Sequence, residues 1–503
     1  MKEKNWKILG YCFLLSILFL LIGTKSSPLY QFNDWVDANI FFTVGKSMVR
    51  GVVPYVELFE QKGPLLYLIY GIGSLISYKT FFGVFLLEVA FFTIFLYYTY
   101  RCFQLYLKKE TCCWLLPLFV AAIIPLRCFT HGGSAEEFCF PFLMISLFHL
   151  LKFLKEEELK ISKKVIFING IIAGGILWIK YTLLGFWFAW MLCIFLLLFS
   201  NKRIKEAIQD GFIFLGGMVL ASIPWILYFG LHHGIQDLIE VYFTFNIKYY
   251  SSEVSLFEKL GKTLHLLQFN FRYYLQFTFF ILIPIVISFF TPILFPKKGR
   301  SFVLLLSVFL LGIGIYIGGT NYRYYALILA PFMMLGFLLI GILIEHYFSY
   351  SKTSVLWAIV NCFCIIAGLF YTYQQSPNTA MLTWKKEEYA QFVFADIISQ
   401  NADPTLLNYG FLDGGFYTTT GTIPKHYFFM RNNISYKVFP KLMKEQRRYV
   451  KEKQPHYVIV RTPTSISYEV VKENYHEIKR HQQIFQGNPI EYILFERNKT
   501  KEL

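Results

Sequence analysis

The stretch from Asn33 to Tyr67 holds the densest early cluster of charged side chains in an otherwise apolar chain. Aromatic residues, among them Trp35 and Tyr55, lie between these charges. From Asp37 onward, apolar residues recur at offsets 3, 4, 7 and 11, a spacing typical of one face of a helix. The pattern predicts a helix that starts near Asp37 and ends at Arg50–Gly51, because glycine commonly follows a helix.

Two carboxylates lie at the start of this expected helix. Asp34 fits the N-cap position, where the side chain of Asp accepts a backbone hydrogen bond. Asp37 lies beside the apolar face, at the expected outer boundary of a membrane, where an ionisable group is costly unless it has a partner or a function. Asp37 could stabilise the positive end of the helix, but its setting favours a functional role.

A lysine precedes a second, short apolar segment. Lys62 lies in "EQKGPLLY", where Gly63–Pro64 predicts a turn before a helix. The lysine could extend its ammonium to the membrane interface. It could equally bind a phosphate at headgroup depth, since a compact ammonium suits an anionic oxygen.

A second polar group, "THGGSAEEFCFPF", spans residues 130–142 in an expected outer loop. His131, Glu136 and Glu137 lie there beside a pair of glycines. Adjacent carboxylates at a helix start often only interact with the helix dipole. These three residues could also polarise a hydroxyl or bind a divalent cation such as Mg²⁺ or Mn²⁺, although no spacing of further ligands supports a metal.

Two isolated cations follow later in the chain. Arg323, in "GGTNYRYYALILAPF", lies at the end of an expected span and is flanked by tyrosines that include Tyr324. This is an ordinary position for an interfacial arginine, or for a guanidinium that binds two phosphate oxygens. Lys180, in "LWIKYTLLG", is similarly an interface anchor or a ligand-binding residue.

Composition assigns the chain to a membrane class. Of the 503 residues, 55% are hydrophobic, 20% aromatic and only 16% charged, and several apolar runs are long enough to cross a bilayer. The net charge of +16 comes largely from short basic clusters between apolar runs, as expected for cytoplasmic loops. No basic stripe with interleaved aromatics is present, so nucleic-acid binding is excluded.

The apolar runs predict a polytopic α-helical protein with about eleven spans. The N-terminal run has no small-residue cleavage site and is read as an uncleaved signal anchor with a cytoplasmic N-terminus. Residues 64–78 are short and contain two glycines, and a crossing there would place the basic loops outside. We expect an interfacial or re-entrant helix instead. The expected spans are about 7–24, 80–101, 113–128, 138–154, 165–179, 183–200, 211–230, 274–295, 302–318, 325–345 and 354–372.

The composition changes after the last span. Charged stretches of helical period, "KKEEYAQF", "KLMKEQRRYVKEKQ" and "VVKENYHEIKRHQQ", alternate with strand-like runs, "TLLNYGF", "HYVIVRT" and "EYILFER". We therefore expect two domains. Residues 1–373 form a transmembrane domain with outer loops at 25–79, 129–137 and 231–273, and residues 374–503 form a small extracytoplasmic α/β domain.

These motifs resemble the GT-C superfamily of membrane glycosyltransferases, in particular its aminoarabinose transferases and protein O-mannosyltransferases. Their first loop reads roughly D-E-x-x-Y-A…G…K-P-P-L. Here Asp37 matches the acidic position, Ala38 replaces the second acid, Lys62 matches the lysine and Gly63 replaces a proline. "GGSAEEF" is similar to the second acidic loop of that family, and "RYYALILAPF" to its arginine-bearing late span.

The resemblance implies an enzyme that moves a sugar from a polyprenyl-phosphate donor to a hydroxyl group outside the cell membrane. Asp37 would be the general base, and Lys62 and Arg323 would stabilise the departing phosphate. The acceptor would be a surface glycopolymer, a lipid or a protein, and membrane lipids would surround the enzyme. The resemblance implies a site with Asp37, Glu136 and Glu137 as catalytic residues and Lys62, Arg323, Asp34, His131, Tyr324 and Lys180 as substrate-binding residues.

Two other classes remain open. A surface-polysaccharide polymerase or ligase also has many spans and large outer loops. A transporter of lipid-linked sugars would place ionisable residues near the middle of its spans. Here Glu88 is the clearest mid-span charge, and the other clusters gather on one expected face, which favours an enzyme at the membrane surface.

Overall fold

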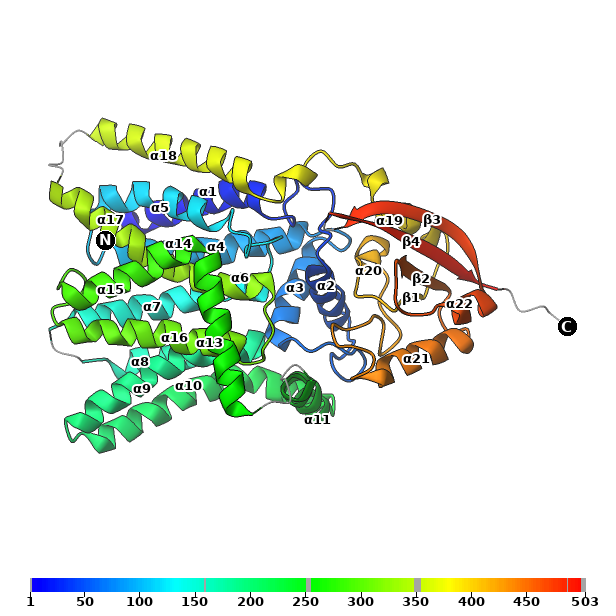
Figure 1. Ribbon diagram of the computed structural model, residues 1–503, viewed down its shortest axis with the longest axis horizontal. Helices are drawn as coiled ribbons and strands as arrows, with labels where there is room; N and C mark the ends of the chain where they lie inside the picture. The colour runs from blue at the N-terminus through cyan, green and yellow to red at the C-terminus, as the bar shows by residue number, and fades with distance from the viewer. Residues whose placement is uncertain (1, 158–159, 250–254, 348–353, 486, 499–503) are drawn as a thin grey trace. The chain divides into compact units, whose positions relative to one another are not determined.

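Helices make up most of the chain in the computed structural model, which describes residues 2–157, 160–249, 255–347, 354–485 and 487–498 (Figure 1). The chain divides into two compact units. The helical unit comprises Met1–Thr24, Glu88–Leu227 and Ser251–Thr379. The mixed unit comprises Lys25–Leu87, Tyr228–Tyr250 and Ala380–Leu503. The first loop is therefore grouped with the C-terminal segment.

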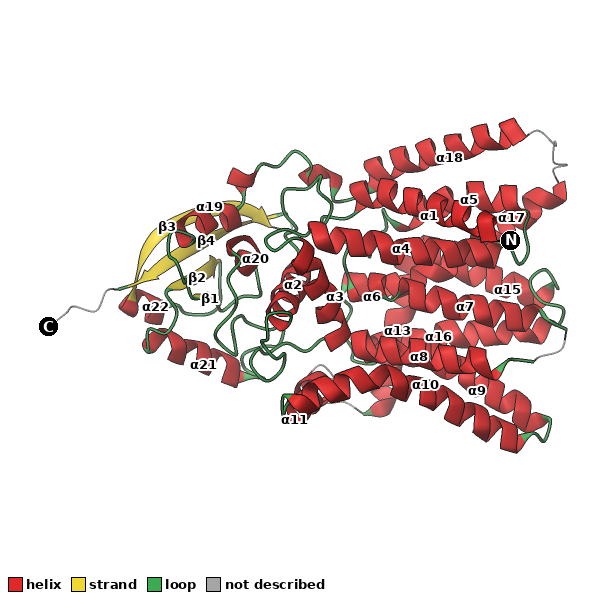
Figure 2. Cartoon of the chain, turned by 180° about the vertical axis from the view of Figure 1, so that it is seen from behind, coloured by secondary structure: helices red, strands yellow, loops and turns green. Residues whose placement is uncertain are grey.

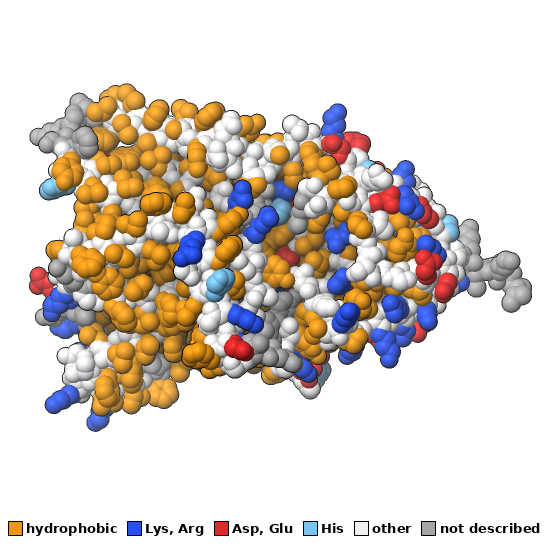
Figure 3. Space-filling model, in the orientation of Figure 1, with side chains coloured by type: hydrophobic (Ala, Val, Ile, Leu, Met, Phe, Trp, Pro, Cys, Tyr) orange, Lys and Arg blue, Asp and Glu red, His pale blue; other side chains and the backbone are white. Residues whose placement is uncertain are grey.

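The helical unit consists of long apolar helices and several short turns. α9 packs against α16, and α5 packs against α18. Apolar side chains cover the surface over α9, α16 and α18, as Figure 3 shows. Such side chains are stable at a surface that faces lipid. The longer helices are α1 (Lys2–Gly23), α4 (Phe82–Phe103), α5 (Lys109–Ile123), α7 (Phe140–Lys155), α8 (Lys163–Lys180), α9 (Gly185–Ser200), α10 (Ile204–Leu231), α13 (Leu256–Tyr273), α15 (Ile283–Phe290), α16 (Ser301–Tyr316), α17 (Met334–Tyr347) and α18 (Ser354–Gln375).

Six helical stretches in the described residues are long and apolar enough to cross a membrane, and a seventh is reached if one bent pair is a single span. The protein is therefore a polytopic helical membrane protein. This number is below the eleven segments expected from hydropathy, for three reasons. The two expected spans 165–179 and 183–200 are joined by the short 3₁₀ turn Tyr181–Leu184, so Lys163–Ser200 is counted as one stretch. α5, α7 and α16 have only 15, 16 and 16 residues, and α13 meets the helix that follows it at 94°.

Two helices of the first loop lie in the mixed unit. α2 (Val36–Met48) and α3 (Pro64–Ile76) pack together. Their backbones approach closely, because a Cβ added at Gly45 would lie 2.4 Å from the carbonyl oxygen of Tyr67. The expected positions are confirmed: α3 starts directly after Gly63, and α2 ends just before Gly51, whose φ is +91°.

The C-terminal segment carries a small mixed sheet, drawn in yellow in Figure 2. The strand order is β1-β2-β4-β3; β1 is parallel to β2, and the other pairs are antiparallel. The three strand-like runs are confirmed as β1, β2 and β4. The elements are α19 (Ala390–Ile398), β1 (Leu406–Tyr409), α20 (Phe416–Thr420), α21 (Pro440–Lys451), β2 (Tyr457–Thr462), α22 (Glu469–Asn474), β3 (Tyr475–Phe485) and β4 (Asn488–Arg497).

The expected helix over "VVKENYHEIKRHQQ" is wrong beyond its first turns. The chain is helical only to Asn474, and from Tyr475 it forms β3. β3 pairs along its length with β4, for example Tyr475 with Arg497 and Ile484 with Pro489. Pairing with a distant strand overrides the local helical pattern, as it commonly does in sheets.

Candidate active site

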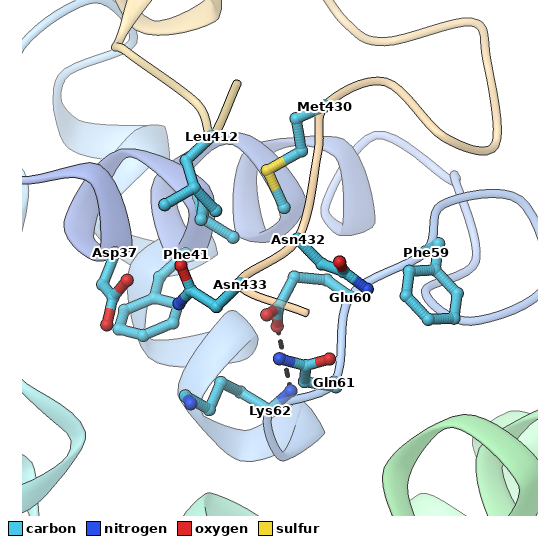
Figure 4. A pocket seen from close by; sticks show the side chains of 11 residues that line it. Asp37, Phe41, Phe59, Glu60, Gln61, Lys62, Leu412, Met430, Asn432 and Asn433 are labelled. Atoms are coloured by element: carbon cyan, nitrogen blue, oxygen red, sulfur yellow. Dashed lines mark hydrogen bonds between the residues drawn. The ribbon is translucent and has the colours of Figure 1, made fainter. Parts of the chain in front are cut away.

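A pocket in the mixed unit is lined by three separate parts of the chain. α2 contributes its first turns, the segment before α3 contributes its backbone and side chains, and the C-terminal segment contributes two loops (Figure 4). About 350 Å³ of space lies between its walls, a volume that includes open solvent at the pocket mouth. Its lining residues are Asp37, Ile40, Phe41, Phe59, Glu60, Gln61, Lys62, Leu412, Met430, Asn432 and Asn433.

Asp37 is the acidic residue that α2 places in this pocket. It lies in the first turn of the helix and only 7% of its surface is exposed. Across the described residues its carboxylate has no hydrogen bond or ion pair to another side chain. A buried carboxylate without a partner is costly, so an external group that shares its proton would find an available acceptor here.

Asp34 does not cap this helix, contrary to the expectation. The N-cap residue is Trp35, and no side chain caps α2. The Asp34 carboxylate instead lies 2.6 Å from the Nζ atom of Lys25, and both side chains are buried. Asp34 pairs with the Lys25 ammonium because a buried charge is most stable beside an opposite charge.

Lys62 lines the same pocket as Asp37, and hydrogen bonds to its backbone fix its position. Its N–H donates to Glu60 Oε2 and to the Tyr67 hydroxyl oxygen, each at 2.9 Å. The hydroxyl of Tyr55 donates to the carbonyl oxygen of Lys62. Burial raises the pKa values of Tyr55 and Tyr67 well above the usual value for tyrosine, so both phenols stay protonated. The backbone that carries the Lys62 ammonium is thereby fixed.

A second polar cluster lies in the helical unit around Glu136, which is fully buried in the short helix α6 (Ala135–Phe138). Lys180, the last residue of α8, donates from Nζ to Glu136 Oε1 at 2.5 Å. The same ammonium lies 3.7 Å from the ring centre of Tyr325 and 5.7 Å from that of Tyr324. Lys180 is therefore more than an isolated interface anchor.

Glu137 lies beside it in a different environment. Its Oε2 accepts from the backbone N–H of Gly133 at 2.8 Å, and Ser134 caps α6 by accepting from the Glu137 N–H. Burial raises the pKa of Glu137 to about 8, although the bond from Gly133 opposes the shift. The described residues contain no group of three or more His, Cys, Asp or Glu side chains placed to hold a metal ion.

His131 and Arg323 also belong to the helical unit. The backbone carbonyl of His131 accepts from the Thr24 hydroxyl at 3.2 Å. Arg323 is exposed and starts the 3₁₀ segment Arg323–Met333. Next to it the rings of Tyr322 and Tyr324 are stacked, with centres 5.9 Å apart. An exposed guanidinium beside stacked rings can meet an anionic ligand from solvent or from the membrane surface.

The structure thus gathers the predicted residues into two groups. Asp37 and Lys62 share the pocket of the mixed unit, and Glu136, Lys180 and Tyr324 share the cluster of the helical unit. Sequence reasoning missed the wall that Leu412, Met430, Asn432 and Asn433 add to the pocket. Those residues follow Asp37 by hundreds of positions, and no local pattern links them to it.

Solved structures show which class this fold resembles. The similarity is one of fold and extends over nearly the whole chain. The first of these structures is ArnT from Cupriavidus metallidurans bound to undecaprenyl phosphate, with a TM-score of 0.60, 11% identity and coverage of 96% of this chain and 98% of that one. The apo state of the same protein gives a TM-score of 0.62, 9% identity and coverage of 98% of both chains.

A weaker likeness is to the arabinofuranosyltransferase AftD from Mycobacteria, with a TM-score of 0.49, 11% identity and coverage of 100% of this chain and 40% of that one. No protein-family model matches the chain, and no curated protein does. At these identities the likeness concerns the fold.

Proposed function

We propose that the protein is a membrane glycosyltransferase that moves a sugar from a polyprenyl-phosphate donor to a hydroxyl acceptor on the outer face of the cell membrane. The observation that carries this proposal is the buried, unpaired carboxylate of Asp37, which lines one pocket with Lys62. The fold supports it, because one of the similar ArnT structures holds undecaprenyl phosphate. The acceptor belongs to a surface glycopolymer, a lipid or a protein.

The reaction is a single displacement. The acceptor oxygen attacks the anomeric carbon of the sugar while the bond from that carbon to the phosphate oxygen breaks. The hydroxyl proton passes to the Asp37 carboxylate, and polyprenyl phosphate leaves with the bonding electrons. A positioned base of this kind accelerates such a step by roughly 10²–10⁴-fold. The Lys62 ammonium stabilises the negative charge that develops on the departing phosphate.

The remaining predicted residues have supporting roles. Arg323 and Lys180 provide cations for the donor phosphate, although Lys180 is already neutralised by Glu136. Tyr324 offers a ring surface, and His131 and Asp34 border the substrate. Glu137 is a buried acid that stays protonated near neutral pH. No step of this mechanism requires a divalent cation.

The arrangement in the membrane is part of the proposal. Residues 1–373 form the catalytic membrane domain with about eleven crossings, and α3 lies at the interface without crossing. The N-terminus is cytoplasmic, and residues 374–503 lie outside. This arrangement is supported by the basic clusters between apolar runs, which favour the cytoplasmic side.

A donor panel tests the proposed activity. The purified protein, in nanodiscs, is incubated with a set of polyprenyl-phosphate sugars and with washed membranes from a strain that lacks this chain. Transfer of sugar from at least one donor, with release of polyprenyl phosphate, is the expected result. If no donor is consumed, while the protein instead carries intact lipid-linked sugar across a vesicle membrane, the protein is a transporter.

A further inference from the structure

The C-terminal segment forms one wall of the Asp37 pocket. Leu412 follows β1, and Met430, Asn432 and Asn433 lie in the loop that precedes α21. Figure 4 shows the Asn433 amide between the Asp37 carboxylate and the side chain of Glu60. The segment therefore brings a neutral polar group to the side chain that the mechanism uses as a base.

This loop is fixed by hydrogen bonds on both sides of the pocket wall. The Arg431 N–H donates to the Phe411 carbonyl at 2.8 Å, and Gln446 Nε2 donates to the Phe428 carbonyl at 3.0 Å. Asn432 Oδ1 accepts from the Ile434 N–H at 3.1 Å. Asn433 therefore projects from a braced backbone, which is what a positioned binding group requires.

The segment is also tied to α2, which carries Asp37. The Thr43 hydroxyl donates to Asp413 Oδ2 at 2.6 Å, and Lys46 Nζ donates to the Tyr417 carbonyl at 2.7 Å. The Thr418 hydroxyl donates to Asn39 Oδ1 at 2.9 Å. All three contacts are buried. They hold α2 against residues 413–418, and the bond from the Arg431 N–H to the Phe411 carbonyl links the loop of Asn433 to the start of that segment.

The chemistry of the two pocket groups is complementary. An ionised Asp37 only accepts hydrogen bonds, whereas the amide of Asn433 can both donate and accept. Within the described residues the Asn433 side chain has no hydrogen bond to another part of the protein. An alcohol placed between them donates its proton to Asp37 and accepts a bond from the Asn433 amide nitrogen. A carboxylate and an amide that line one pocket suit a polyhydroxylated molecule.

We propose that Asn433 positions the hydroxyl of a polyhydroxylated acceptor against Asp37, so that the C-terminal segment supplies the acceptor half of the site. This inference rests on the proposed function, because the base takes its proton from the acceptor. Asn433, which lies next to the Asp37 carboxylate in Figure 4, is therefore placed to contact the acceptor.

The first test separates the two substrates. Asn433→Ala is assayed with the donor identified by the panel and with washed membranes from a strain lacking this chain as acceptor. Loss of one neutral hydrogen bond is worth about 0.5–1.5 kcal/mol, so the acceptor KM should rise roughly 2- to 10-fold while the donor KM stays unchanged. Ser435→Ala is the matched control, because Ser435 is exposed in the same loop and does not line the pocket.

The second test measures proximity to the base. Asn433→Asp is nearly isosteric and places a second carboxylate beside Asp37, which raises the pKa of the base. The acid limb of the kcat/KM profile should therefore move to higher pH, by about one unit or more. Ser435→Asp should leave the limb in place. A merely structural role for Asn433 would not move the limb.

The outcomes separate this inference from the proposed function. Thermal unfolding in detergent confirms that each variant is folded. If the acceptor KM and the acid limb are both unchanged in the Asn433 variants while Asp37→Asn is inactive, the acceptor role of Asn433 is wrong and the glycosyltransferase proposal stands. If Asp37→Asn is fully active, the proposed function itself fails. A change confined to the donor KM also overturns the acceptor role.

Discussion

Lys180 at the end of α8 and Glu136 in α6 form a buried ion pair with 2.5 Å between Nζ and Oε1. The contact joins residues 44 positions apart. The carboxylate is fully buried and the lysine side chain is 10% exposed, so each charge depends on the other for its stability in the fold.

Removing one partner of this pair should destabilise the helical unit. Lys180→Met keeps much of the side-chain volume but leaves Glu136 buried and unpaired, which costs about 3–5 kcal/mol. The double variant Lys180→Met with Glu136→Gln should recover much of that loss, because no buried charge is left. Unfolding of the detergent-solubilised protein measures both. Equal stability of the single and double variants would contradict a coupled pair.

Asp37→Asn should lose activity by roughly 10²–10⁴-fold, because Asn cannot accept the acceptor's proton. The loss should be seen in matched amounts of folded protein. Asp403→Asn is the control: Asp403 is exposed and pairs with Lys425 at the surface, so activity per folded molecule should stay near wild type. If Asp37→Asn loses activity only in proportion to its loss of folded protein, the role of Asp37 is structural.

Lys62→Ala should raise the KM for the polyprenyl-phosphate donor and lower kcat, because the leaving phosphate loses its cation. Lys62→Arg should rescue only in part, since a guanidinium differs from an ammonium in shape and reach. Arg323→Ala should show the same direction of change. Donor titrations at fixed acceptor measure these effects. Unchanged donor kinetics in both alanine variants would mean that Lys62 and Arg323 only anchor the protein at the membrane interface.

The stability of the fold should fall as pH rises through the range set by Glu137. Its pKa is about 8 in the folded protein against an ordinary value of 4.5. Between these values the folded state binds a proton that the unfolded state has lost, so the slope of stability against pH is negative, at most about 1.4 kcal/mol per pH unit for one group. Glu137→Gln mimics the protonated form and should remove this component. Unfolding curves at pH 5, 6, 7 and 8, with wild type and variant side by side, check it.

Reporter fusions test the proposed topology. Fusions after residues 110, 160 and 400 should report cytoplasm, cytoplasm and exterior, because the first two positions lie next to basic clusters of the sequence and the third lies in the C-terminal segment. A cytoplasmic reading at 400 would mean that α3 crosses the membrane. The site would then face the wrong side for a donor whose phosphate lies at the outer surface.

Local patterns predicted the helices around the site well. The spacing from Asp37 to Met48 was sufficient to place α2, and Gly63–Pro64 was sufficient to place the start of α3. Such features depend on residues a few positions apart. Sequence also placed Asp37 and Lys62 together, through the resemblance of their motifs to a known loop.

Long-range contacts could not be read from the sequence. Asp34 was expected to cap a helix, but Lys25 is the partner it found. The sequence of β3 has a helical pattern, but the segment forms a strand because it pairs with β4. The pocket wall at Asn433 and the ties from α2 to Asp413 span hundreds of residues, and no periodicity or motif announces them.

β3 is one of the two edge strands of the sheet. Among the described strands β3 pairs only with β4, so its other backbone edge is open to recruitment by a second extended chain. His476, Glu477, Lys479 and Arg480 are exposed along it, and charges of this kind discourage such recruitment. A membrane protein is concentrated in two dimensions, where neighbouring copies meet often. We therefore expect the charged edge of β3 to keep neighbouring copies from pairing into a continuous sheet.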